Sequence, residues 1–150
     1  MNNRLLDDPQ LISVKTLTHA MRICSRYCMD DVQTAIANVV SRAGRPNTLD
    51  IAIERLALCA EFPSYFKDDV ISALFVCTCR WVGHPTGKQL KPLQTRLDLV
   101  AHIMSGRVIF FTRDPQKLYV YEQWMEDKSG SLDGKKAEVL EAIRKPPENV

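Results

Sequence analysis

The chain has 150 residues, of which 45% are hydrophobic and 25% are charged, and its formal net charge at pH 7 is +2. These values fit one globular domain with a sizeable core. The cysteines argue against a disulfide scaffold, because they number five, which is odd, and three of them fall at apolar helical positions.

The basic residues are concentrated in one part of the chain. Residues 76–117 hold seven Lys and Arg against two Asp, whereas residues 1–75 and 118–150 each carry a small acidic excess. A local basic cluster favours an anionic partner more than a mild overall charge does. The alternative is a solvated face without a partner.

Three amphipathic helices are predicted in the first 62 residues. The first spans residues 9–29, the second begins at Asp30 and stops before Gly44, and the third follows Thr48, whose hydroxyl can cap it. In each of them apolar residues recur at intervals of three and four. The first ten residues lack the apolar core of a signal peptide, so we expect a cytoplasmic protein.

The longest apolar run, 70–82, is predicted to be the central helix. Its non-apolar members are Ser72, Thr78 and Arg80. Asp68 and Asp69 precede it and suit a helix N-terminus, where free backbone amides favour carboxylates. A buried strand is the alternative, because residues 75–82 are rich in β-formers, but the run is long for a strand. Arg80 makes it too short for a membrane span, so no membrane partner is expected.

A loop and a fifth helix are expected next. His84, Pro85 and Gly87 are predicted to prevent helix in the segment 84–92. The helix then spans 90–104, and Gly106 ends it. Its predicted buried residues are Leu93, Leu97, Val100, Ile103 and Met104.

The sequence then changes to a strand-like pattern. Two β-branched and aromatic runs flank an Asp-Pro turn, which predicts a β-hairpin over 107–122. A linker over 127–135 and a helix over 136–144 complete the chain. We therefore predict a mainly α fold, in which a single domain, 1–150, packs about five helices over 9–105 as a compact bundle that carries a C-terminal β-hairpin and a short terminal helix.

No pattern for catalysis or for a metal site is evident. The chain lacks GxSxG, HExxH and Gly-rich phosphate-loop motifs. Cys24 and Cys28 have a spacing that can chelate on a helix, whereas Cys77 and Cys79 would point apart. We expect the cysteines to be small buried apolar residues. We accordingly expect no enzymatic activity, no catalytic residue, no metal and no cofactor.

The first functional hypothesis is a non-enzymatic helical interaction module, such as an adaptor, a chaperone or an assembly component. Such a module would bind a protein partner or itself as a homo-oligomer. The outer face of the predicted hairpin would supply an aromatic interface. The residues expected there are Phe111, Tyr119 and Tyr121.

The alternative is a nucleic-acid-binding regulatory protein with a winged-helix-like basic segment at 80–117. Two helices followed by a hairpin have the order of a winged helix-turn-helix, in which the second helix enters the major groove. The side chains expected to contact nucleic acid or another anionic partner are Lys88, Lys91, Gln94, Arg96, His102, Arg107, Arg113 and Lys117.

Overall fold

The structure, a computed structural model, describes residues 13–111 and 132–146. Within these two ranges the chain forms seven α-helices and two short 3-10 helices, and no strand. The α-helices are α2 (Val14–Arg26), α3 (Asp30–Arg42), α4 (Leu49–Glu61), α5 (Asp68–Cys79), α6 (Gly87–Leu90), α7 (Leu97–Phe111) and α9 (Asp133–Arg144). The 3-10 helices are η1 (Pro63–Tyr65) and η2 (Lys91–Leu93).

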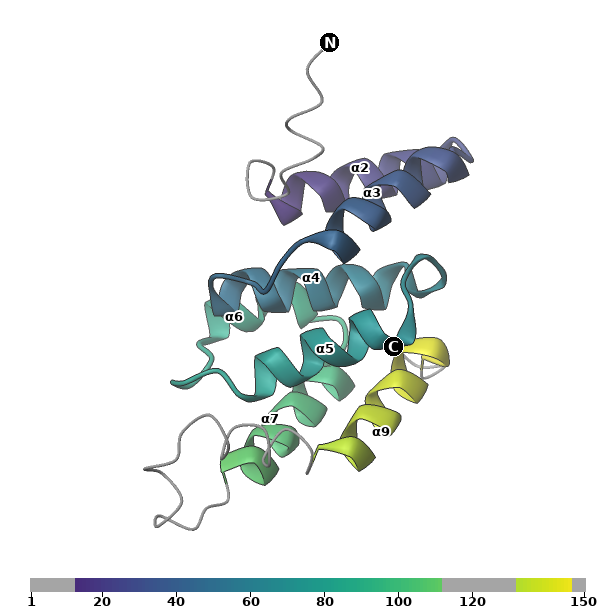
Figure 1. The fold of residues 1–150 in the computed structure, drawn as a ribbon. Coiled ribbons are helices and arrows are strands. Elements are labelled where there is room, and N and C mark those ends of the chain that lie inside the picture. The colour runs from purple at the N-terminus through teal and green to yellow at the C-terminus, as the bar shows by residue number, and fades with distance from the viewer. Residues whose placement is uncertain (1–12, 112–131, 147–150) are drawn as a thin grey trace.

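The helices are stacked around α4 and α5 (Figure 1). The antiparallel pair α2 and α3 lies on one side of α4, and α5 packs against the other side. Helices α7 and α9 then pack against α5 and against each other. The short α6 and η2 lie beside α4. Helix α5 therefore occupies the centre of the lower part of the molecule.

The first three predicted helices are present, and local signals in the sequence explain where they begin. Thr48 Oγ1 accepts a hydrogen bond from the Ile51 amide at 3.2 Å, as predicted for the cap of α4. The paired aspartates at 30–31 and 68–69 lie in the first turns of α3 and α5, where the helix dipole favours negative charge. The Met29 and Lys67 side chains at the N-cap positions make no capping hydrogen bond.

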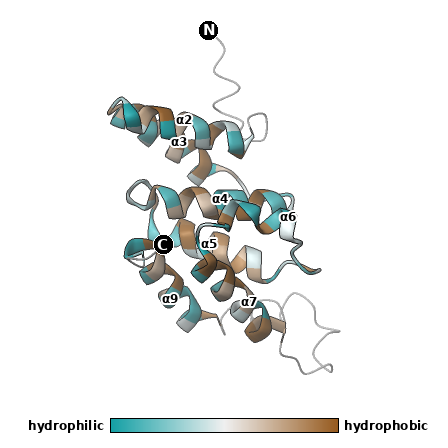
Figure 2. Cartoon of the chain, turned by 180° about the vertical axis from the view of Figure 1, so that it is seen from behind, coloured by the Kyte–Doolittle hydropathy of each residue, from teal (hydrophilic) through white to brown (hydrophobic). Residues whose placement is uncertain are grey.

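The prediction of a central helix is confirmed, and the strand alternative is wrong. Ile71, Phe75 and Cys79 of α5 are fully buried, and they follow the spacing of one helical face. Figure 2 shows the apolar ribbon concentrated on α5 and α7. The helix ends at Cys79, three residues before the predicted end of the apolar run at 82.

The predicted β-hairpin over 107–122 is contradicted by the structure. Residues 107–111 are the last turn and a half of α7, and residues 112–122 lie outside the described residues. Gly106 does not end the helix, because α7 continues through it. A Cβ at this position would lie 2.6 Å from Cys79 Sγ, so glycine is needed where α7 crosses α5 closely. Without the hairpin, the winged-helix-like arrangement is also wrong.

The segment 84–104 differs from its prediction in two ways. Thr86 and Gln89 form a capping box that begins α6 inside the expected loop. Helix α7 begins at Leu97 rather than at residue 90, and its buried face is set by Leu99, Ile103 and Phe110. The expected burial of Leu97 and Met104 is wrong, since both are exposed.

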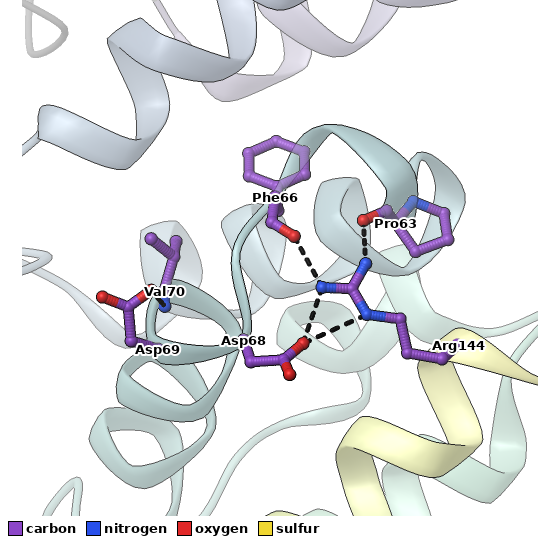
Figure 3. A network of polar contacts seen from close by, with 6 residues as sticks. All are labelled: Pro63, Phe66, Asp68, Asp69, Val70 and Arg144. Atoms are coloured by element: carbon purple, nitrogen blue, oxygen red, sulfur yellow. Dashed lines mark hydrogen bonds and ion pairs between the residues drawn. The ribbon is translucent and has the colours of Figure 1, made fainter.

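The predicted C-terminal helix is confirmed, and it begins three residues earlier than predicted. It was predicted over 136–144 and spans Asp133–Arg144, while residues 127–131 of the predicted linker lie outside the described residues. Arg144 holds its end in place (Figure 3). The guanidinium binds Asp68 Oδ1 at 2.7 Å and donates to the carbonyl oxygens of Phe66, at 2.6 Å, and of Pro63. Helices α5 and α9 therefore run antiparallel.

Candidate functional site

Arg107, predicted to contact an anionic partner, has its side chain buried at the end of α5. Its guanidinium donates to the carbonyl oxygens of Thr78 and Cys79, both at 3.4 Å, and of Trp81, at 2.8 Å, and also to that of Gly83. Carbonyls at a helix C-terminus have no intrahelical donor, so Arg107 satisfies them from a neighbouring helix. Burial lowers the pKa of this guanidinium.

Arg96 is also used inside the fold. It lies just before α7 and forms two hydrogen bonds with the Asp98 carboxylate, at 3.0 and 2.9 Å. The same guanidinium donates to the Ala142 carbonyl of α9 at 2.7 Å. The hydrogen bonds from Arg96 hold the pKa of Asp98 below its usual value. This pair therefore links the start of α7 to the C-terminal helix.

His102 lies half-buried between α7 and α9. Its Nδ1 is 3.4 Å from Lys135 Nζ and 3.7 Å from Glu138 Oε2. Lys135 and Glu138 are themselves paired at 2.8 Å. The hydrogen bond from Lys135 lowers the pKa of Glu138. His102 thus belongs to a small polar cluster at a helix–helix contact.

The remaining predicted residues on described segments, Lys88, Lys91 and Gln94, line one cleft. It has a volume of about 680 Å³ and lies over α4, between α2 and the α6–η2 segment. The other cations around it are Lys15, Arg22 and Arg96, and its carboxylates are Asp50, Glu54 and Glu61.

Several cleft residues are already paired with each other. Arg22 and Glu61 form a bidentate ion pair at 2.7 Å, and Gln89 donates to Asp50 at 2.7 Å. Burial raises the pKa of Glu54, and the charge of Lys15 opposes this change. Because this cleft contains charges of both signs and several of them are paired, its positive electrostatic potential is weaker than its lysines alone would produce.

Two residues of the expected aromatic interface, Tyr119 and Tyr121, lie outside the described residues. The predicted anionic-partner residues Arg113 and Lys117 lie outside them as well. Phe111 is described at the end of α7 and is half-buried. Its ring makes an edge-to-face contact with Phe110, with 4.9 Å between centroids, and the Arg107 guanidinium lies 5.3 Å from its centroid.

The structure reveals an apolar surface that the sequence reasoning missed, at the tip where α2 joins α3. Four large apolar side chains are exposed there within ten positions: Ile23 (55%), Tyr27 (74%), Met29 (45%) and Val32 (40%). We call this surface the α2–α3 tip. The sequence does contain one indication of this surface. Ile23 and Tyr27 are apolar but lie outside the buried stripe of α2, which contains Leu17, Met21 and Cys24.

The α2–α3 tip is held in one geometry by its turn. Cys28 has a φ of 55°, in the left-handed region that usually selects glycine. The Cys28 amide donates to the Ser25 carbonyl at 3.4 Å and the Met29 amide to the Cys24 carbonyl at 2.8 Å, which is the Schellman pattern. At the base of α3, Tyr65 Oη lies 2.6 Å from Asp30 Oδ1 and 2.9 Å from Gln33 Oε1.

A second exposed apolar surface follows the outer face of α7. Leu97, Ala101, Met104 and Val108 are exposed at spacings of four, three and four residues. This spacing places them on one side of the helix.

The cysteines do not form a metal site in the part of the chain that the structure describes, and no three His, Cys, Asp or Glu there are placed to hold an ion. Cys24 is buried in α2, whereas Cys28 lies beyond the end of that helix and is exposed. They therefore do not share a helix face. Burial raises the pKa of the Cys59 and Cys79 thiols to about 12.

Comparison of the chain with protein families, curated proteins and solved structures finds no match. In the described ranges, 13–111 and 132–146, every helix is too short or too polar to cross a membrane.

Proposed function

We propose that the protein is a helical interaction module that binds a protein partner, including a second copy of itself, through the α2–α3 tip. The observation that carries this proposal is the exposure of Ile23, Tyr27, Met29 and Val32 where α2 joins α3. Monomeric proteins rarely leave contiguous large apolar side chains in water without a use for them.

The composition of the tip suits a protein partner. Tyrosine and methionine are enriched at the centres of protein interfaces, and tyrosine is a frequent hot spot. Around them lie charged side chains of both signs, Arg26 on α2 and Asp31 on α3. A mixed polar rim is usual for protein–protein contacts, whereas a nucleic acid or an anionic membrane would call for a positive surface.

The rigidity of the tip favours binding as well. The Schellman turn at Cys28 and the Tyr65 contact fix the ends of α2 and α3 before any partner arrives. A pre-organised surface loses less conformational entropy on association, so more of the contact free energy appears as affinity.

Site-specific crosslinking tests the proposal. A photoreactive benzophenone amino acid in place of Tyr27 should give a discrete protein adduct in cells that express the chain naturally. The matched control places it at Thr34, an exposed position on α3 outside the tip, where no adduct of that mass should form. Sedimentation velocity over a range of concentrations shows whether the adduct is a second copy. Equal labelling at both positions, or no adduct at position 27, contradicts the proposal.

A further inference from the structure

A second cleft, of about 670 Å³, lies between α5 and the turn that joins α3 to α4. Along α5 it is lined by small and apolar side chains, including Ala73 and Val76. Four cations line it as well, Arg45, Arg55, Arg80 and Lys136, and the carboxylate among the lining residues is Asp69. Its size lies within the range of small-molecule sites, which is roughly 300–1,000 Å³.

Arg55 is an unusual member of this lining because it is buried without an acidic partner. It lies on α4 and is 6% exposed. Its Nη1 donates to the Gly44 carbonyl at 2.8 Å, and no carboxylate in the described residues lies within ion-pair distance of it. Burial lowers the pKa of Arg55. A guanidinium has five N–H donors, and a buried cation is normally paired.

Arg80 contributes a second unsatisfied group. It is the C-cap residue of α5, and its Nε is buried without a hydrogen-bond partner among the described residues. More than nine in ten buried polar groups in proteins have a partner, and leaving a donor unsatisfied costs about 1–3 kcal/mol. Arg80 is also among the residues that line the cleft.

Three of the cations that line the cleft, Arg45, Arg55 and Arg80, form no ion pair among the described residues. Arg45 follows Gly44, whose carbonyl accepts from Arg55. Asp69 is at the other end of α5, in its first turn, a full helix length away from Arg80. Lys136 lines the cleft from α9 but is already paired with Asp133 at 2.8 Å. Three arginines therefore remain for one ligand group.

We propose that this cleft binds a small molecule carrying a phosphate group, which lies among Arg45, Arg55 and Arg80 while an apolar body extends along α5 beside Val76. Guanidinium forks match phosphate oxygens in bidentate geometry. Three positive charges suit a phosphate monoester, with a charge of about −1.5 to −2, better than a carboxylate with a single charge. This site is separate from the α2–α3 tip, so each can fail without the other.

Titration calorimetry on the full chain tests the proposal with three probes of known chemistry. Phenyl phosphate should bind at least about tenfold more tightly than benzoate, which has a similar ring and one charge, and than inorganic phosphate, which has no apolar body. Phenyl phosphate should also raise the melting temperature, by an amount that grows with the logarithm of one plus the ratio of the free phenyl phosphate concentration to Kd.

Variants then locate the site. Arg45→Gln with Arg80→Gln should weaken phenyl phosphate binding by at least about tenfold. Lys88→Gln with Lys91→Gln removes the same charge from the other cleft and should change the affinity by less than about twofold. Arg55 is left intact because its bond to Gly44 supports the fold, and circular dichroism is used to check that both variants fold.

Three results would overturn the proposal. The first is no heat and no thermal shift with phenyl phosphate at millimolar concentration. The second is equal weakening by both double variants, which means general attraction of anions to a basic surface. The third is benzoate binding as tightly as phenyl phosphate, which means that the arginines do not select phosphate.

Discussion

Gly106→Ala should destabilise the protein although alanine is the better helix former. Inside a helix, glycine costs about 1 kcal/mol relative to alanine, so propensity alone predicts a gain. At this position, however, the new Cβ would lie 2.6 Å from Cys79 Sγ and 3.0 Å from Phe75 Cζ. Both residues are fully buried, and overpacking a dense core costs up to about 3 kcal/mol. The expected net loss is about 2 kcal/mol.

Gly134→Ala is the matched control. Gly134 lies in the first turn of α9, and a Cβ there meets no heavy atom within 4 Å. Urea unfolding followed by circular dichroism should therefore show a gain of up to about 1 kcal/mol for this variant. In a Cys79→Ala background, Gly106→Ala should cost at least about 1 kcal/mol less than in the native chain, because the sulfur is gone.

Equal stabilisation by the two substitutions would refute the reasoning. If Gly106→Ala stabilises the chain as much as Gly134→Ala does, then α7 does not cross α5 closely at Cys79. The helical assignment of residues 107–111 would then lose its tertiary explanation.

Three further predictions concern an arginine, an aspartate and a cysteine. Arg107→Met should lower the free energy of unfolding by about 2–4 kcal/mol, because carbonyls at the end of α5 lose their charged donor; a loss below about 0.5 kcal/mol in urea unfolding would contradict the capping role. The pKa of Asp98 is lower in the folded chain, so its stabilisation is complete above the unfolded value of about 3.9 and is lost as the pH falls through the folded value. Asp98→Asn should accordingly flatten the decline of stability below about pH 4, and an unchanged acid profile would count against the Arg96 pair. At pH 8, Cys28 should react with a thiol reagent far faster than the other four cysteines, which are buried; fast labelling that persists in Cys28→Ser would argue against this packing.

The parts of the fold that were predictable are those whose signals are local. Thr48 caps its own helix, and the paired aspartates at 30–31 and 68–69 mark helix starts through interactions within one turn. The capping box of Thr86 and Gln89 is also a local signal in the sequence. It was missed because the neighbouring proline and glycines predicted a loop.

The predicted hairpin failed because tertiary contacts override local propensity. Residues 108–111 are β-branched and aromatic, and Gly106 shortly before them resembles a helix stop. The glycine is instead required by contact with Cys79, and Phe110 is fully buried within α7. Neither contact is visible in the sequence around it.

The candidate sites show the same difference between local signals, which can be read from the sequence, and tertiary contacts, which cannot. Their positive charge made Arg96 and Arg107 candidates for binding an anionic partner. The sequence could not show that both already donate hydrogen bonds to backbone carbonyls elsewhere in the fold. Conversely, Arg55 and Arg80 lie among apolar residues, and nothing in the sequence predicts that they line one site. Their shared cleft depends on how α4 and α5 pack.

The affinity of the crosslinked partner for two double variants tests the proposed function most directly. Ile23→Ser with Tyr27→Ser alters the α2–α3 tip, and Leu97→Ser with Met104→Ser removes a similar apolar area from α7. If the tip is the interface, the first pair should weaken binding by at least about 30-fold, the effect of losing one hot spot of about 2 kcal/mol, and the second by less than about twofold. The reverse order would place the interface on α7 and contradict the proposal for the α2–α3 tip.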